Sequence, residues 1–513
     1  MRIRNSMKNM VVIYSCTLLI AIMNFVVRKV FLDTLTIDYL GYDGLFTSIF
    51  SYLNLSEMGI ASIITYHMYS EIATNNVLQI RKLLSIYKIV YRVIGVFVLV
   101  TGMIVSLFLP IILIRQKLND SWQFIYVIYF LQLTATLCTY FLAYRRILFV
   151  THQRIYVCTM VDTAINIFSI AARMFILIRL RNYIAYLIVT IVANVASNLI
   201  ISALSRREYP EITSIKVTRE DVRILNLWDE AKNMLATKIA ATIYGASDDI
   251  IITSMLGIGT NGIVSNYRMV SSKLQEFILS AFNSIQASIG NLVYDEESDR
   301  RIPFFHVLDL AGFGLALVSG TGVISVCQEF VLTVWLKKSE LALPYAFVIL
   351  LGLNLFIAIQ NNPMNYFRNS LGHFETDRNY MIAAAAVNVI LSIALGLKLG
   401  VVGVMIGTVA GHLLIYMGRT IVVYRFFIQK SPAGYYLLTL GRFGLLALSV
   451  IITWFIGQAT RPFISGHLLF FLAKGMISVV TSLIIFLLSS IRTDSFRLLM
   501  EYVKKAAGSL RRH

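Results

Sequence analysis

The chain has 513 residues, of which 58% are hydrophobic and only 14% are charged, and its mean hydropathy is +0.74. Soluble proteins average about 25% charged residues, so this chain has too little polar surface for water. The formal net charge of +18 could suggest nucleic acid, but no basic stripe accompanies a soluble fold that would present it. Composition therefore excludes a soluble protein and argues against nucleic-acid binding.

Apolar runs near the length of about 20 residues that crosses a bilayer recur along the whole chain. We predict an all-α polytopic membrane protein with about 14 transmembrane helices, of which the second and eighth are the most polar. The predicted spans are 10–31, 43–69, 89–113, 121–144, 155–178, 182–204, 233–256, 262–292, 304–327, 343–366, 380–399, 402–425, 437–457 and 467–490. The first run is too long for a cleavable signal and lacks a small-residue cleavage site, so it is predicted to be a span.

The basic residues predict the orientation of the chain. Most of the 45 Lys and Arg fall in segments that are cytoplasmic if the N-terminus is cytoplasmic, notably the 205–232 linker and the C-terminal tail. This positive-inside bias predicts that both termini are cytoplasmic. The 4 cysteines all lie within predicted spans, which indicates neither a disulfide framework nor a metal site.

The two parts of the chain on either side of the 205–232 linker resemble each other. The segment YLGYDGLFTSI at 39–49 is similar to MLGIGTNGIVSNY at 255–267, and AINIFSIA at 164–171 is similar to AVNVILSIA at 386–394. The two offsets agree at about 220 residues, which predicts two parallel six-helix repeats around a central cavity. The predicted domains are 1–215, 216–430, and 431–513 with two additional helices and a basic cytoplasmic tail.

One motif imitates a cofactor site. The segment Gly257-Ile-Gly-Thr-Asn-Gly262 matches G-x-G-x-x-G, but a dinucleotide site requires a preceding strand within a βαβ unit. Here the segment joins two membrane helices, so we predict a tight interhelical turn. The sequence contains neither a P-loop motif for ATP nor an H-E-x-x-H zinc pair, and no catalytic residues are predicted.

Charges within spans are candidate functional residues, and they concentrate on the first two helices of each repeat. Arg28 ends the first span, Glu57 lies near the middle of the second, and Asp248 and Asp249 lie in the seventh. The eighth span carries Arg268, Lys273 and Glu276. At 100° per residue its Arg268, Ser272, Gln275 and Gln286 fall near one line, with Asn283 close by. Such a polar stripe would not face lipid, which predicts a water-filled cavity between the repeats.

Each of these residues also has a simpler interpretation. Arg28 could extend its charge to the membrane interface, and Asp248 or Asp249 could form a structural ion pair. Glu57 could be a hydrogen-bonding residue in helix packing, and Lys273 could pair with Glu276 rather than face the cavity. Arg173, Arg419 and Lys474 lie on other helices and are interpreted as structural. His67 and His306 are interpreted as interfacial residues rather than proton carriers.

At these same residues the chain resembles a known family. The segment 25–69 is similar to the start of polysaccharide repeat-unit (Wzx-type) flippases of the multidrug/oligosaccharidyl-lipid/polysaccharide exporter superfamily. The family pattern is matched by Arg28, by Leu40-Gly41 with Gly44-Leu45-Phe46, and by Ser56-Glu57 with Gly59-Ile60. SDDIIITSMLG, SNYRMVSSKL, VNVILSIAL and LGVVGVMIGT also resemble that family, and the likeness covers roughly 10–425.

The resemblance implies a flippase, not an enzyme, that moves undecaprenyl-diphosphate-linked oligosaccharides across the bacterial cell (inner) membrane by alternating access, for surface polysaccharide synthesis. Polysaccharide polymerases and glycosyltransferases are its candidate partners. Arginine binds phosphate through paired hydrogen bonds, and hydroxyl and amide side chains suit sugars. The predicted substrate-binding residues are Arg28, Arg268, Lys273, Ser272, Gln275, Asn283 and Gln286. The predicted gating or ion-coupling residues are Glu57, Asp248, Asp249 and Glu276, with no resident cofactor and with H⁺ or Na⁺ as candidate coupling ions.

The repeat also suggests a gate. Arg28 shifted by 220 residues falls on Asp248, so one of the two aspartates is predicted to pair with Arg28 when the outer side is closed. The alternative functions are a peptidoglycan-precursor lipid flippase and a multidrug antiporter of the same superfamily. A membrane polysaccharide polymerase would need a long outer loop with catalytic residues, which the predicted loops lack.

Overall fold

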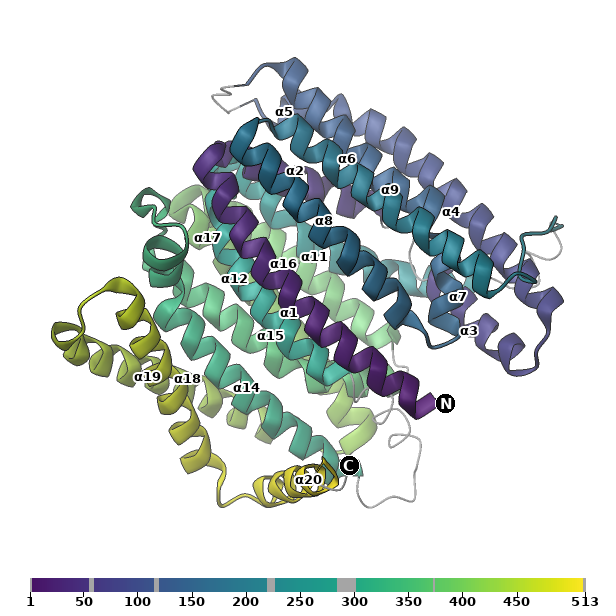
Figure 1. Ribbon diagram of the computed structural model, residues 1–513. Coiled ribbons are helices and arrows are strands. Elements are labelled where there is room, and N and C mark those ends of the chain that lie inside the picture. Colours follow the sequence, from purple (N-terminus) through teal and green to yellow (C-terminus); the bar gives the residue numbers. More distant parts are fainter. Residues whose placement is uncertain are drawn as a thin grey trace. The chain divides into compact units, whose positions relative to one another are not determined.

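The computed structural model describes residues 2–54, 60–114, 120–218, 227–283, 301–371 and 374–510. The regular elements in these ranges are helices, and no strand occurs among them (Figure 1). Within the described residues, 12 helices are long and apolar enough to cross a membrane. The predicted all-α polytopic membrane protein is therefore confirmed. The two predicted spans missing from that set, 43–69 and 262–292, are the two most polar ones.

The chain forms two compact units, Met1–Gly262 and Ile263–His513. The first contains α1 (Arg2–Thr34), α2 (Ile37–Leu53), α3 (Ile60–Ala73), α4 (Val77–Ser106), α5 (Leu109–Ile112), α6 (Trp122–Leu142), η2 (Ala143–Arg145), α7 (Arg146–Thr151), α8 (Ile155–Arg179), α9 (Tyr183–Glu208) and α11 (Leu227–Leu256). α11 packs against α2, which places the boundary after α11 instead of in the linker. The predicted division at 215/216 follows the sequence repeat and stays a prediction.

The second predicted span is divided in the structure. α2 ends at Leu53, and the backbone N–H of Asn54 bonds to the carbonyls of Phe50 and Tyr52. α3 begins at Ile60.

Polar contacts join α7, α8 and α9 within the first unit. On α7, the guanidinium of Arg146 donates to both carboxylate oxygens of Asp162 on α8, at 2.8 and 2.7 Å, and also to Ser197 and Asn198 on α9. Such bidentate pairs fix geometry as well as charge. The described start of the linker also contacts the first unit, because Arg81 on α4 donates to the Thr213 hydroxyl at 2.9 Å.

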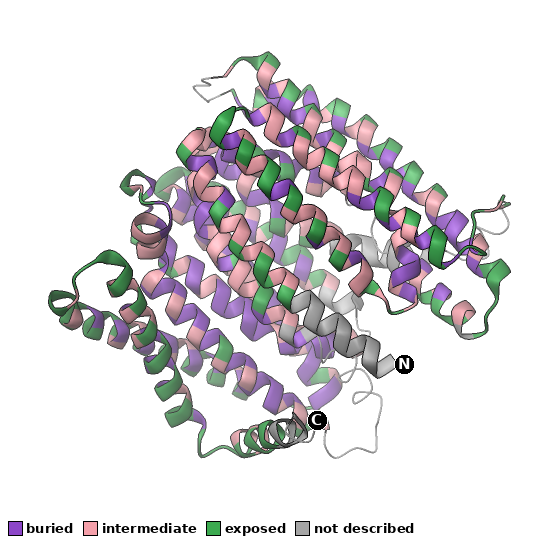
Figure 2. Cartoon of the chain, viewed as in Figure 1, coloured by how far each residue is buried: buried purple, intermediate pink, exposed green. Residues whose placement is uncertain are grey.

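The second unit contains most of α12 (Ile258–Asn283), whose first residues belong to the first unit. Its other elements are α14 (Arg301–Glu329), η3 (Phe330–Trp335), η4 (Ser339–Leu341), α15 (Tyr345–Leu371), α16 (Phe374–Leu399), α17 (Val401–Val423), η5 (Tyr424–Ile428), α18 (Ala433–Thr460), η6 (Arg461–Phe463), α19 (His467–Ser490) and α20 (Asp494–Leu510). α14 and α15 are mostly buried, whereas α18 and α19 expose much of their surface (Figure 2).

Ion pairs connect both C-terminal helices to α14. Arg442 on α18 pairs with Asp309 at 2.6 Å, and both side chains are almost completely buried, with exposed fractions of 6% and 3%. Lys474 on α19 pairs with Glu329 at 2.9 Å at the other end of α14. Lys474, which is interpreted from sequence as structural, takes part in a contact between helices. The two additional helices are integral to the second unit, although the sequence repeat does not include them.

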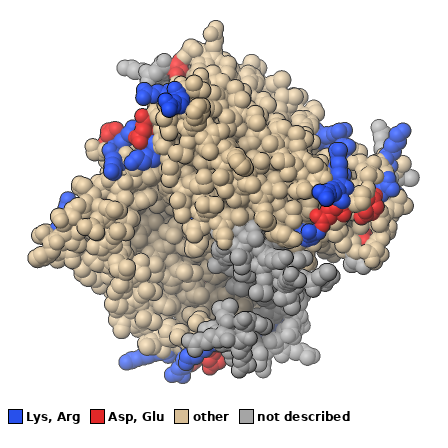
Figure 3. All heavy atoms as spheres, viewed as in Figure 1, with Lys and Arg blue, Asp and Glu red and all other residues tan. Residues whose placement is uncertain are grey.

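The surface agrees with a membrane environment. On the face shown in Figure 3, charged side chains of the described residues gather near the ends of the helices and leave wide areas without charge. Many large apolar side chains are exposed, including Phe168, Phe175, Leu437, Leu440 and Leu488. Patches of this kind mark contact with lipid or with another protein.

Candidate functional site

The first unit contains a polar cavity of about 340 Å³. Small-molecule sites usually measure about 300–1,000 Å³, so the cavity is large enough for a ligand group such as a sugar or phosphate. It lies among α2, α6, α8 and α9. Its lining residues are Asp43, Thr47, Phe50, Ser51, Asn54, Leu131, Gln132, Ala135, Thr136, Arg173, Tyr186, Leu187, Thr190 and Ile191.

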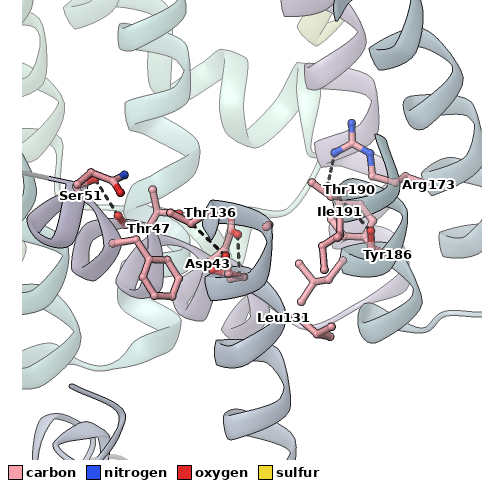
Figure 4. Close-up of a pocket in the computed structure, with 14 residues that line it drawn as sticks. Asp43, Thr47, Ser51, Leu131, Thr136, Arg173, Tyr186, Thr190 and Ile191 are labelled. Carbon is pink, nitrogen blue, oxygen red and sulfur yellow. Dashed lines mark hydrogen bonds between the residues drawn. The ribbon is translucent and has the colours of Figure 1, made fainter. Parts of the chain in front are cut away.

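Helical periodicity explains why these side chains converge. On α2, Asp43, Thr47, Phe50, Ser51 and Asn54 are spaced by three or four residues and share one face of the helix. α6 and α9 contribute side chains at the same spacing. Figure 4 shows Asp43, Thr47 and Ser51 on one side of the pocket, with Arg173 and Tyr186 on the other.

Arg173 is the cation on the cavity wall. Its guanidinium donates to the backbone carbonyl of Ser169 at 3.4 Å and to the hydroxyl of Tyr186 at 3.3 Å. The guanidinium also lies 5.3 Å from the centre of the Tyr186 ring, within cation–π range. These contacts orient the guanidinium. They use its Nε and Nη1, so an anion can bind to the remaining N–H groups.

Asp43 lies within the electrostatic range of two arginines. Its carboxylate accepts a hydrogen bond from Gln132 Nε2 at 3.1 Å and interacts with Arg28 on α1 as well as with Arg173 on α8. Gln132 also donates to the Tyr183 hydroxyl at 3.3 Å. The cavity therefore contains a carboxylate, Asp43, and a guanidinium, Arg173, that come from different helices.

The remaining polar side chains offer hydrogen-bond acceptors. The hydroxyls of Ser51, Thr136 and Thr190 donate to carbonyls of their own helices, at 2.8, 3.1 and 3.2 Å. The carbonyl oxygen of Asn54 accepts from the Tyr140 hydroxyl at 2.8 Å. Because the three hydroxyl protons are used locally, their oxygens can accept hydrogen bonds from the hydroxyl groups of a sugar.

Three predicted site residues lie in the first unit but are not among the residues that line this cavity. Arg28 is half-buried and interacts electrostatically with Asp43, Tyr183 and Tyr186. Asp248 is buried on α11. Asp249 accepts a hydrogen bond from Ser48 on α2 at 2.9 Å, which connects α11 to α2, and the predicted roles of both aspartates stay predictions.

The predicted residues of α12 beyond Gly262 belong to the second unit. Lys273 pairs with Glu276 at 2.7 Å, which is the simpler of its two interpretations. Ser272 is exposed and donates to the carbonyl of Met269 at 3.2 Å, while Arg268 and Gln275 are half-buried. The predicted roles of these residues in substrate binding and gating stay predictions.

Several predicted residues cannot be placed. Glu57 and Gln286 lie outside the described residues, and the side chain of Asn283 is likewise outside the description. Among the described residues, no group of three or more His, Cys, Asp or Glu side chains could hold a metal ion.

The charged residues of the cavity lie outside the set predicted from sequence. Arg173 is interpreted as structural because it lies outside the four polar helices, and the structure places it on the cavity wall. Asp43 and Gln132 gave no signal, since Asp43 begins a predicted span and Gln132 is an isolated amide. Helical spacing of Asp43 with Thr47, Ser51 and Asn54 was the available clue.

The fold of the chain is similar to that of solved membrane transporters. The lipid II flippase MurJ in an inward closed conformation matches with a TM-score of 0.66 at 15% identity, covering 94% of this chain and 100% of that chain. An inward-facing multidrug resistance MATE family transporter of the MOP superfamily matches with a TM-score of 0.56 at 11% identity, covering 79% and 96%. A MATE transporter of Vibrio cholerae gives 0.55 at 12% identity, covering 82% and 97%.

The family is shown by a sequence model described as "Polysaccharide biosynthesis protein", which matches residues 6–285, more than half of the chain. The chain belongs to this family, and its likeness to the solved structures is one of fold. No sequence among curated proteins matches it. The resemblance that the sequence motifs indicated is therefore confirmed.

Proposed function

We propose that this protein flips undecaprenyl-diphosphate-linked oligosaccharide repeat units from the cytoplasmic to the outer face of a bacterial cell membrane for surface polysaccharide synthesis. The observation that supports this most directly is the cavity of the first unit. It combines the arginine Arg173 with the hydroxyl and amide groups of Thr47, Ser51, Asn54 and Gln132. A diphosphate requires cations, and a sugar requires many hydrogen-bonding partners.

The proposal includes the orientation and the partners predicted from the sequence. Both termini would be cytoplasmic, and the cargo would be supplied by glycosyltransferases and consumed by a polymerase. An H⁺ or Na⁺ gradient would drive transport, with Glu57, Asp248 and Asp249 as coupling candidates. Asp43 joins this group, because its carboxylate lines the cavity and interacts electrostatically with Arg28 and Arg173.

Replacing Arg173 with alanine tests the cavity. We expect Arg173→Ala to slow the transfer of labelled lipid-linked oligosaccharide across proteoliposomes by roughly ten- to a hundredfold, because hydrogen bonds to charged groups contribute about 1.5–3 kcal/mol. The matched control is Arg179→Ala, an exposed arginine at the end of the same helix. Equal rates in the two variants would remove the cavity from the transport pathway.

The same vesicles separate the candidate cargoes. A repeat-unit flippase is expected to move the oligosaccharide lipid faster than a peptidoglycan-precursor lipid, and to move no lipophilic cation. The MurJ-like fold makes the precursor lipid the relevant competitor, although 15% identity speaks only for the fold. Faster movement of the precursor lipid would contradict the proposal and identify the precursor lipid as the substrate.

A charge exchange tests the predicted gate. We expect Arg28→Asp and Asp248→Arg each to lower transport at least about tenfold, and the double variant to recover much of it, because an opposite pair is restored. Arg28→Asp combined with Asp43→Arg is the competing pair, since Asp43 interacts with Arg28 in the structure. Recovery confined to the second pair would assign Arg28 to Asp43 and end the gate hypothesis.

A further inference from the structure

The second unit contains a separate cavity of about 670 Å³ between α14 and α18, closed at one end by the turn from α19 to α20. The lining residues on α14 are His306, Asp309, Leu310 and Phe313. Those on α18 are Gly434, Leu437, Leu438, Gly441, Arg442 and Leu445, and the turn adds Ser489, Ser490, Thr493 and Ser495. The cavity lies entirely within the second unit.

Missing side chains produce the open space along α18. Gly434 and Gly441 are seven residues apart, about two turns, and therefore face the same side of the helix. A β-carbon built at either glycine would meet no atom within 4 Å. Leu437, Leu438 and Leu445 complete this face, and Leu437 is 72% exposed. The result is an apolar groove on a surface that lipid can reach.

The floor of the cavity is polar but electrically satisfied. Arg442 donates to both carboxylate oxygens of Asp309, at 3.1 and 2.6 Å, and its guanidinium lies 4.9 Å from the centre of the Phe313 ring. Asp309 accepts further bonds from Tyr435 at 2.6 Å and Gln360 at 2.9 Å. Because this pair is balanced, the floor does not require a charged ligand, and a hydrocarbon chain can lie along the leucines.

The mouth of the cavity is hydroxyl-rich, in contrast to the apolar face of α18. Ser489, Ser490, Thr493 and Ser495 place a group of hydroxyls where α19 ends and α20 begins. Arg492 lies in the same turn and is exposed, and Arg497 follows in the first turns of α20 with a side chain that is 73% exposed. The Thr493 hydroxyl donates to the Ser490 carbonyl at 2.7 Å, and Arg497 pairs with Asp494 at 3.6 Å on the exposed surface. The donors for a phosphate group at this mouth are therefore the two guanidinium groups, which form paired hydrogen bonds with phosphate oxygens.

α20 is amphipathic in the manner of a helix at a membrane surface. Phe496, Leu499, Met500 and Val503 share one side at 100° per residue, whereas Arg497 and Lys504 lie on another. The helix is held beside the start of α14, where Tyr502 contacts Phe304 with ring centres 6.0 Å apart (Figure 1). The mouth of the cavity is therefore expected at the level of lipid headgroups.

We infer that this cavity binds an anionic membrane phospholipid, with one acyl chain along the glycine and leucine face of α18 and the phosphate bound by Arg492 and Arg497 beside the turn from α19 to α20. The charge of the arginines selects an anionic headgroup over a zwitterionic one. A bound lipid would join α14, α18 and α20, and it would act as a structural ligand of the C-terminal helices. This inference does not depend on the identity of the transported cargo.

Filling the groove tests the site. The purified protein in mild detergent is incubated with phosphatidylglycerol or with phosphatidylcholine of the same chains, and bound lipid is counted by native mass spectrometry. We expect phosphatidylglycerol to bind about tenfold more tightly, and Gly441→Phe to reduce its binding about tenfold. Gly444→Phe is the matched control, because Gly444 lies on the same helix with open space but does not line the cavity. Equal binding in Gly441→Phe and Gly444→Phe would overturn the inference.

A second variant tests the headgroup without altering the core. Arg492→Gln combined with Arg497→Gln changes only exposed side chains and is expected to abolish the preference for phosphatidylglycerol over phosphatidylcholine. An unchanged preference would contradict the role of the two arginines. A long-chain prenyl phosphate is added in a competition arm, and its displacing phosphatidylglycerol at equal concentration would assign the cavity to the transported lipid instead.

Discussion

Asp309→Asn is expected to lower the stability of the protein more than any surface substitution, because it leaves the buried guanidinium of Arg442 without its carboxylate. Removing one partner of a buried ion pair costs about 3–5 kcal/mol. Both side chains are almost fully buried, so water cannot solvate the guanidinium once the carboxylate charge is removed. Asp309 also accepts hydrogen bonds from Tyr435 and Gln360, which the substitution disturbs. The measurement is the temperature at which half of the protein remains monodisperse after heating in detergent.

Two controls make this result specific. Asp494→Asn affects an exposed pair with Arg497, whose atoms are 3.6 Å apart, and is expected to leave that temperature unchanged. Replacing both charges, Asp309→Leu with Arg442→Met, is expected to recover part of the loss, since no uncompensated charge remains. Recovery should be incomplete because Tyr435 and Gln360 lose their acceptor. Normal stability in Asp309→Asn would show that the pair contributes little to the fold.

Gly41→Ala is the second substitution with a large expected effect. A β-carbon at Gly41 would lie 2.0 Å from the carbonyl oxygen of Ile258, a backbone atom that cannot turn aside. α2 would have to move away from the turn between α11 and α12, and the bond from Asn261 to the Gly41 carbonyl, 3.3 Å long, would be lost. Overpacking of this kind costs about 1–3 kcal/mol, and more where backbone is involved.

A series of glycine substitutions grades this prediction. Gly262→Ala should also be harmful, because its β-carbon would lie 2.4 Å from the carbonyl oxygen of Ile37. Gly259→Ala should be milder, since the neighbouring atom at 2.9 Å belongs to the side chain of Asp38, which can move. Gly245→Ala on α11 meets nothing within 4 Å and should be neutral or slightly stabilising. The same heating assay measures the series, and equal behaviour of Gly41→Ala and Gly245→Ala would contradict it.

The glycine motif at 257–262 shows how far sequence reasoning reaches. The absence of a preceding strand excluded a dinucleotide site and predicted a tight turn between helices. The structure confirms that turn, with Gly257 at a φ of 113°. It adds that Gly262 packs on α2, with Gly41 N 3.3 Å from where its β-carbon would be. That contact joins residues more than 200 positions apart, so no local pattern could show it.

Ion pairs also differ in how well the sequence predicts them, depending on how far apart the two residues lie in the chain. Lys273 and Glu276 lie three residues apart on one helix, and the sequence alone suggested that they pair. Asp309 and Arg442 lie close to the ends of predicted spans, where charges are common, and the sequence does not predict that they pair. Their pairing required α14 and α18 to be neighbours, which is a property of the packed bundle.

The sequence by itself determined that the chain is a helical membrane protein of the polysaccharide biosynthesis family, because apolar runs of bilayer length and short family motifs are local features. Only the tertiary structure decided which polar faces meet. Arg173 and Asp43 share a cavity because α8 and α2 turn the appropriate sides toward it. Such a meeting depends on the rotation and crossing of helices, and these are set by packing between distant segments, not by the period of any one of them.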